Sequence, residues 1–226
     1  MGYPLAKILR SQLERKIHAY EPMPVLDARE FAWAKRVESL YPEIRKEVET
    51  LLKDVEKIQN FNDVLPGQRA LKQDAMWKSY FLYALKKEIT PNCAACPNTL
   101  SAIKEIPGVI NAFFSILKPG VEIPPHRGPY AGIMRYHLGV IIPKGDVGIR
   151  VDKTVYRWEE GKSLFFDDSF DHEAWNRTDS IRVILFVDIE RELPTYLGIL
   201  NRILINIFSL SKSARYAQKK ITNSVT

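Results

Sequence analysis

The fold is decided by the stretch between Ser115 and Arg182, whose centre reads HRGPYAGIMRYHLGVIIP at residues 126 to 143. Successive side chains of a strand point to opposite faces of its sheet. From residue 134 to residue 142, one face carries Arg135, His137 and Gly139, and the other carries Met134, Tyr136, Leu138 and Val140. We predict that the polar face lines an interior that holds a small anion, and that the apolar face meets the core of a sandwich.

Short runs of the same kind continue on both sides of this stretch. We predict strands at residues 77–83, 111–117, 148–151, 154–158, 163–166 and 181–187, with Phe165, Trp158 and Trp175 in the core. Many short strands at this spacing indicate an antiparallel sandwich or barrel. Residues 5–18, 41–58 and 99–105 are predicted as helices, and residues 59–74, which include Pro66-Gly67, as a loop. The predicted fold class is therefore mainly β with flanking helices, an α+β arrangement.

The whole-chain composition suits one domain with a helical annex. A chain of 226 residues can bury a sizeable core, and its net charge of +6 favours anionic partners in general. No nucleic-acid-binding signature is present, so we expect no nucleic-acid partner. The start, Met1-Gly2-Tyr3-Pro4, lacks the apolar region of a signal peptide, and a cytoplasmic location is expected.

The two cysteines, Cys93 and Cys96, form a single CxxC pair. Such a pair supplies two of the four ligands of a structural zinc, and nothing nearby in the sequence completes the set. We interpret them as two thiols in a loop that leads to a helix.

Two histidines and an arginine indicate the chemistry. His126 and His172 belong to separate predicted strands, and Arg182 follows His172 by ten residues in an otherwise apolar run. Imidazole suits Fe(II) and leaves other positions of the ion open for small ligands. Arginine offers a planar fork that binds a carboxylate at two points. Together these residues predict a mononuclear iron site with an anionic cosubstrate.

Three stretches of the chain resemble a known family. HRGPYAGIMRYHLGVIIP, WEEGKSLFFDDSFDHEAWN and RVILFVDIER, at residues 126–143, 158–176 and 182–191, are similar to the aspartyl/asparaginyl β-hydroxylases. The resemblance implies an iron- and 2-oxoglutarate-dependent dioxygenase, which consumes O2, on a double-stranded β-helix (cupin or jelly-roll) core. RYHLGV and Cys96-Pro97-x-Thr99 also resemble a second branch, the lipid A acyl-chain hydroxylases. The implied organisation is a helical flank at 1–74, a catalytic domain at 75–192, and a C-terminal helix with a basic tail at 193–226.

The resemblance also implies roles for individual residues. His126 and His172 would be the metal ligands, and Arg182 would anchor the distal carboxylate of 2-oxoglutarate. The remaining cosubstrate contacts implied by the family are Ser115, Arg135 and His137. For Arg135, an ion pair with an acid is the open alternative, because internal arginines commonly pair with acids.

Most dioxygenases of this type place a carboxylate two residues after the first histidine, where this chain has Gly128. The aspartyl/asparaginyl β-hydroxylases also have glycine there, so water would take the third position. Asp168, four residues before His172, is predicted to hold that water. Two alternatives stay open: Asp168 is a solvated loop acid, or Gly128 is required by a φ that a side chain does not tolerate.

The sequence leaves the substrate open. A peptidyl Asp/Asn-type substrate is the family's own. Its peptide-acting members, however, carry a second arginine two positions before the counterpart of Arg135, where this chain has Ile133. A lipid acyl chain is the first alternative. A non-catalytic jelly-roll binding module, with Gly128 marking a decayed site, is the second.

Residues 196–210 are mostly apolar and precede the basic residues Lys212, Arg215, Lys219 and Lys220. At about fifteen residues this segment is too short to span a bilayer. One interpretation is a peripheral membrane contact that pairs the basic end with anionic lipid. The other is a helix packed on the sheet or in a dimer.

Overall fold

This computed structural model describes residues 4–64 and 76–223. The loop predicted at residues 59–74 lies only partly in this range. Its first part contains a short helix, α4 (Phe61–Val64), instead of continuous loop. The remainder, with Pro66-Gly67, is outside the described residues.

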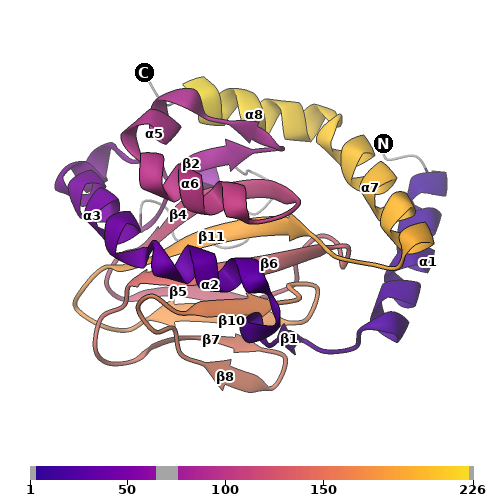
Figure 1. The fold of residues 1–226 in the computed structure, drawn as a ribbon, viewed down its shortest axis with the longest axis horizontal. Helices are drawn as coiled ribbons and strands as arrows, with labels where there is room; N and C mark the ends of the chain where they lie inside the picture. The colour runs from indigo at the N-terminus through magenta and orange to yellow at the C-terminus, as the bar shows by residue number, and fades with distance from the viewer. Residues whose placement is uncertain (1–3, 65–75, 224–226) are drawn as a thin grey trace.

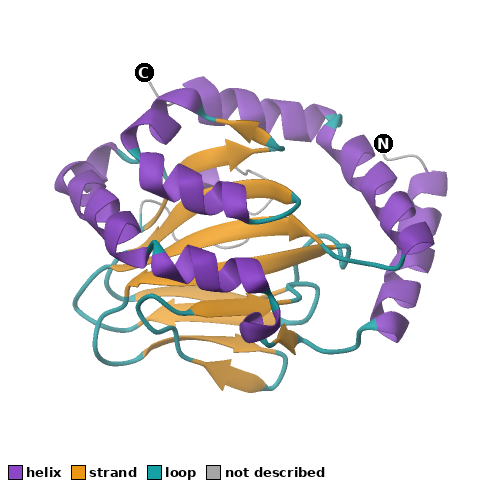
Figure 2. Ribbon diagram, viewed as in Figure 1, coloured by secondary structure: helices purple, strands orange, loops and turns teal. Residues whose placement is uncertain are grey.

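Two antiparallel sheets form the centre of the molecule (Figures 1 and 2). In spatial order, the larger sheet consists of β1 (Val25–Leu26), β9 (Ser163–Phe166), β6 (Ile133–Ile141), β11 (Arg182–Glu190), β4 (Val109–Leu117), β2 (Trp77–Ala84) and β3 (Lys87–Glu88). The smaller sheet consists of β5 (Val121–His126), β10 (His172–Asn176), β7 (Val147–Val151) and β8 (Thr154–Tyr156). From β4 to β11 the chain passes back and forth between the sheets, with one hairpin, β7–β8, inside the smaller sheet. This winding is a double-stranded β-helix, so the predicted fold class is confirmed.

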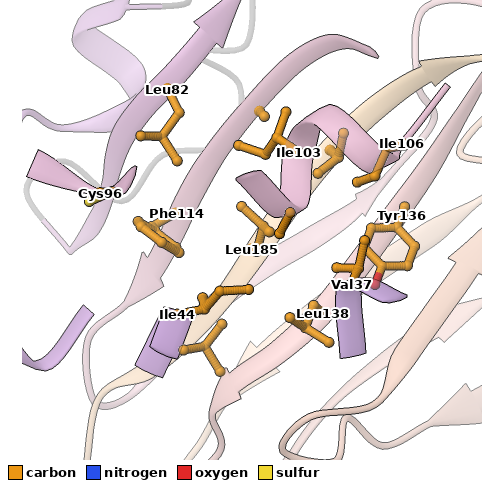
Figure 3. Close-up of a cluster of buried hydrophobic side chains, with 14 of the residues drawn as sticks. Val37, Ile44, Leu82, Cys96, Ile103, Ile106, Phe114, Tyr136, Leu138 and Leu185 are labelled. Carbon is orange, nitrogen blue, oxygen red and sulfur yellow. The ribbon is translucent and has the colours of Figure 1, made fainter. Parts of the chain in front are cut away.

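Helices cover the outer face of the larger sheet: α2 (Ala32–Ser39), α3 (Tyr41–Leu51), α5 (Thr90–Ala95) and α6 (Pro97–Glu105). Figure 3 shows Val37, Ile44 and Ile103 of these helices against side chains of the sheet. The apolar face of β6, with Tyr136 and Leu138, packs in this layer. Our prediction that this face meets the sandwich core was therefore wrong. The larger sheet is covered on both sides, and the polar face of β6 points into the space between the sheets.

The space between the two sheets holds a second apolar cluster. Phe113 and Leu117 of β4 share it with Ile149 of β7 and Ala174 of β10. The Phe113 ring lies 4.3 Å, centroid to centroid, from that of Phe186 on β11. Phe165, Trp158 and Trp175 are buried as predicted. Apolar side chains, many of them aromatic, therefore fill the space between the sheets, and the polar residues of β6 and β11 that face this space have apolar neighbours.

The predicted helices are found with small changes of bounds. Residues 5–18 lie in α1 (Pro4–Tyr20), residues 41–58 contain α3 followed by the 3-10 helix η2 (Leu52–Lys57), and residues 99–105 lie in α6; a further 3-10 turn, η1 (Ala28–Glu30), was not predicted. Cys93 lies within α5 and not in a loop, and Cys96 follows directly. Both thiols are buried and free, and burial raises the pKa of Cys96 to about 12. The pair therefore belongs to the core.

The C-terminal part forms two helices, α7 (Thr195–Ser209) and α8 (Lys212–Asn223). α7 lies beside α1, and α8 continues along the edge of the larger sheet at β2 (Figure 1). One face of α7, with Leu197, Leu204 and Ile205, packs against Leu13 and Ile17 of α1. No helix within the described ranges is long and apolar enough to cross a bilayer.

Candidate active site

His126 and His172 meet where the smaller sheet ends. His126 is the last residue of β5, His172 is the first residue of β10, and the two are direct partners in the strand register. Their ring centroids are 4.1 Å apart. Nδ1 of His126 lies 2.8 Å from the carbonyl oxygen of Pro124, and Nδ1 of His172 lies 3.0 Å from that of Phe170. Because a carbonyl only accepts, each Nδ1 carries the proton, and each Nε2 keeps a free lone pair.

The surroundings keep both imidazoles neutral. Burial is the main cause that lowers the pKa of His126, and it lowers the pKa of His172 to about 3. The positive charge of Arg135 adds to both effects. Neutral imidazole is the form that binds metal ions. The pair therefore offers two ligands, although no group of three or more His, Cys, Asp and Glu side chains in the described residues is arranged to hold a metal.

Arg182 is a buried cation without an acidic partner. It is 1% exposed, and no carboxylate among the residues that the structure describes lies within ion-pair distance of it. Its Nη1 lies 3.4 Å from the carbonyl oxygen and 3.5 Å from Oγ of Ser115, and its guanidinium stands 4.8 Å from the Trp158 ring centroid. Its Nε has no hydrogen-bond partner among the described residues. Burial lowers the pKa of Arg182 to about 9. A buried charge in this state is costly unless an anion joins it.

Two further donors lie beside Arg182. Trp158 Nε1 donates to Nδ1 of His137 at 3.3 Å, so the His137 proton is on Nε2. That Nε2 is buried and has no partner in the described part of the chain. Trp77 Nε1 donates to Ser115 Oγ at 3.0 Å, which leaves the Ser115 hydroxyl proton free to donate.

Sequence reasoning missed the roles of both tryptophans. Trp158 was predicted only as a core residue, and Trp77 only as the start of a strand. The available signal was the indole N–H, which usually finds a partner when it is buried.

Arg135 is held between two acids. Its Nη2 lies 2.8 Å from Oδ2 of Asp168 and 3.0 Å from Oδ1 of Asp188, and Asn111 donates to Asp188 Oδ2 at 2.9 Å. The ion-pair alternative for Arg135 is thus the one seen here, and Asp188 is a site residue that the sequence did not suggest.

Asp168 is 1% exposed, so its interpretation as a solvated loop acid was wrong. Burial raises the pKa of Asp168 to about 7, against the opposing effect of the Arg135 charge. The neighbouring Asp167 is also buried and is paired with Arg191, which in turn donates to the Ala131 carbonyl oxygen at 2.8 Å. These contacts fix the loop that carries Asp168.

A cavity of about 510 Å³ reaches His126, the first histidine of the pair. His126, Gly128 and Arg135 line one part of it. Most of the remaining wall is apolar: Phe61, Trp77, Phe81, Ala84, Phe113, Ile133, Phe186, Phe208, Ala217 and Ile221. Arg182 and His137 are not part of this wall and are buried in the larger sheet. The site therefore combines an apolar cavity at His126 with two buried donors, Arg182 Nε and His137 Nε2, that have no hydrogen-bond partner in the described residues.

The fold and this grouping of residues define a cupin-type double-stranded β-helix protein. The chain belongs to the aspartyl/asparaginyl β-hydroxylase family, whose model matches residues 38–192, and is thus a member of a family of hydroxylases. It is 43% identical over 186 residues to the ornithine lipid ester-linked acyl 2-hydroxylase of Rhizobium tropici, covering 81% of this chain and 66% of that protein. It is 35% identical over 130 residues to the human aspartyl/asparaginyl beta-hydroxylase, covering 55% of this chain and 17% of that protein.

Among solved structures, a cupin domain of a transcriptional regulator from Enterobacter cloacae aligns with a TM-score of 0.36 and 12% identity, over 52% of this chain and 99% of that one. The Cnp3 cupin domain of Schizosaccharomyces pombe aligns with the same TM-score and identity, over 52% of this chain and 67% of that one.

Proposed function

We propose that this protein is an Fe(II)- and 2-oxoglutarate-dependent hydroxylase that acts on the acyl chain of a lipid. The observation that carries the proposal is Arg182, a fully buried cation without an acidic partner in the described structure, on the strand that follows the histidine pair.

The residues present fit an iron ion. His126 and His172 would hold it through their Nε2 lone pairs, since imidazole is a suitable ligand for Fe(II). Asp168, whose carboxylate lies beside Gly128, would accept a hydrogen bond from a water in the third protein position. With 2-oxoglutarate and O2, the bound iron supplies the oxidant that converts a C–H bond to C–OH.

The residues also fit a dicarboxylate. Arg182 would bind the distal carboxylate of 2-oxoglutarate with its Nε and Nη atoms, which offer the bidentate geometry of a guanidinium. The Ser115 hydroxyl and His137 Nε2–H are free to donate to the same molecule. Because these groups are buried, water competes little and each charge-assisted hydrogen bond is strong.

The cavity favours a lipid acyl chain over a peptidyl aspartate. An acidic side chain would need a free cation in the wall, yet Arg10 pairs with Glu14 and Arg135 pairs with Asp188 and Asp168. Ile133 lines the cavity where peptide-acting relatives carry arginine. The rhizobial relative is named for acyl hydroxylation. Burying methylene groups in such a wall is favourable by about 0.8 kcal/mol for each CH2.

The test combines metal binding with turnover. Fe(II) affinity is measured without oxygen for the parent, His126→Ala, His172→Ala and the control His18→Gln, whose imidazole lies near Ser169 and Phe170. We expect each of the first two variants to lose most iron affinity and the control to keep it. Succinate release and the gain of one oxygen are then followed by mass spectrometry on lipid and on peptide fractions.

Normal iron binding by His126→Ala would place the metal elsewhere. A parent protein that binds iron and 2-oxoglutarate but releases no succinate with any fraction would instead support the non-catalytic binding module. Hydroxylated peptide without hydroxylated lipid would restore the peptidyl Asp/Asn substrate.

A further inference from the structure

We infer that α7 and α8 form a surface that docks on an anionic lipid bilayer and admits an acyl chain to the cavity. The second part rests on the proposed function, and the first part does not.

The evidence begins with the outer face of α7, which lacks a partner within the described structure. Tyr196, Ile199, Leu200, Ile203, Ile207 and Leu210 recur every three or four residues, so they share one side of the helix. Each is about half exposed or more, from 48% for Leu200 to 65% for Leu210. We call these six side chains the α7 stripe. The opposite side of α7 is the one that packs on α1.

Exposed apolar side chains are concentrated in this part of the molecule. Of the fourteen large apolar side chains exposed in the described residues, eight lie between Tyr196 and Tyr216. Two more, Ile8 and Leu9, lie on α1, which packs against α7. Contiguous exposed apolar surface of this kind marks an interaction site in soluble proteins.

The charge near the α7 stripe indicates what kind of partner binds there. Residues 193–226 contain five basic residues, Arg202, Lys212, Arg215, Lys219 and Lys220, and no aspartate or glutamate. On α8 the side chains of Arg215, Lys219 and Lys220 are exposed. A basic rim beside an apolar stripe is what an anionic lipid surface attracts. A second copy of this chain would bring the same positive charge against itself, so a bilayer fits better than a dimer.

The cavity reaches the surface at the C-terminal end of α7 and at α8. Phe208 and Tyr216 are 39% and 52% exposed, and both also line the cavity that reaches His126. Ser211 and Ala214, at the junction of α7 and α8, line it too. An acyl chain would therefore pass from the bilayer into the apolar wall without crossing water.

The experiment measures vesicle binding of the apo protein, so neither iron nor turnover is needed. The vesicles contain equal amounts of phosphatidylcholine and phosphatidylglycerol, with phosphatidylcholine alone for comparison. The apolar variant is Ile203→Asp/Ile207→Asp, and neither residue lines the cavity. The matched control is Val155→Asp, which changes an equally exposed side chain, at 51%, on β8. The charge variant is Lys219→Glu/Lys220→Glu.

We expect the parent and Val155→Asp to bind the mixed vesicles, and the apolar variant to bind at least about tenfold more weakly. The charge variant should lose about fivefold or more for each lysine and should resemble the parent on phosphatidylcholine alone. The melting temperatures of the variants should match that of the parent, because all five substituted residues are exposed.

Three results would overturn the docking surface: no binding by the parent, equal binding by parent and apolar variant, or a parent dimer in sedimentation that the apolar variant dissociates. The entry route is supported if the apolar variant hydroxylates acyl chains in detergent but does not hydroxylate them in vesicles. Weakened vesicle binding by Val155→Asp, at the melting temperature of the parent, would be a fourth result against the assignment to α7.

Discussion

The carboxylate of Asp168 fills the space that a side chain at Gly128 would occupy. An ideal Cβ at Gly128 would overlap Asp168 Oδ2, Oδ1 and Cγ. The Gly128 N–H donates to the Asp168 backbone oxygen at 2.6 Å, which holds the two residues together. The described glycines with a left-handed φ are Gly108, Gly120, Gly145 and Gly161. The alternative that Gly128 is required by its φ was therefore wrong, and the close approach of Asp168 is what requires glycine.

Gly128→Asp should consequently destabilise the apo protein and should not raise iron affinity. The space for a carboxylate is taken, and overpacking a buried site costs about 1–3 kcal/mol before the repulsion of two acids is added. Apo melting temperature and anaerobic Fe(II) affinity check this outcome. The double variant Gly128→Asp/Asp168→Gly removes the overlap and should recover most of the lost melting temperature. A single variant that melts like the parent and binds iron more tightly would show that Asp168 moves away freely.

We expect Arg182 to lower the stability of the apo protein and to be required for binding 2-oxoglutarate. Arg182→Met removes a buried charge that lacks an acidic partner in the described structure, so the apo protein should melt at the same or a higher temperature. Stabilisation by added 2-oxoglutarate should disappear. Arg182→Lys keeps a charge but loses the fork, and its affinity for 2-oxoglutarate should fall about tenfold or more. Calorimetric titration of the three proteins measures both effects. An Arg182→Met variant that still binds 2-oxoglutarate would show that another residue anchors it.

The apo protein should lose stability in mild acid through His172. Burial lowers the pKa of His172 to about 3 from an ordinary 6.5, so between these values the unfolded chain binds the proton and the folded chain does not. Stability is therefore lost as the pH falls below 6.5, by on the order of 2 kcal/mol at about pH 5. Melting temperatures of the parent and His172→Gln in chelator, between neutral pH and about pH 5, test this. The variant should show a flatter profile, and identical profiles would assign the acid sensitivity to other groups.

Ile133→Arg tests the substrate class. Ile133 lines the cavity and is partly buried, so a guanidinium there would put a charge in an apolar wall. We expect acyl hydroxylation to fall by at least about tenfold, the equivalent of losing about 1.4 kcal/mol. Ile133→Leu, which keeps the volume, should retain activity. An increase in hydroxylation of an acidic peptide by the arginine variant, from a measurable level in the parent, would favour the peptidyl substrate.

Sequence reasoning succeeded where a local pattern has one physical meaning. Alternation along residues 134–142 determines which side chains share a face, and His126 and His172 were expected to meet and are register partners. Sequence reasoning failed where the role of a strand face depends on which element packs against that face. The apolar side of β6 lies under α2, α3 and α6, and nothing in the alternation distinguishes a layer of helices from a second sheet.

The sequence by itself determined the class of fold, the family, and the residue types available to the site, because strand periodicity and short motifs are local properties of the chain. Only the tertiary structure decided that Asp168 stands in the place of a side chain at Gly128, that Asp188 pairs with Arg135, and that Arg182 has no acid near it in the described residues. The first two relationships join residues that are 40 and 53 positions apart, and the third depends on a missing neighbour. Asp188 and Arg135 are register partners on the neighbouring strands β11 and β6, and Gly128 and Asp168 lie in loops that follow β5 and β9. Strand pairing and the winding of the chain between the two sheets bring these residues together, and both are set by the whole chain at once.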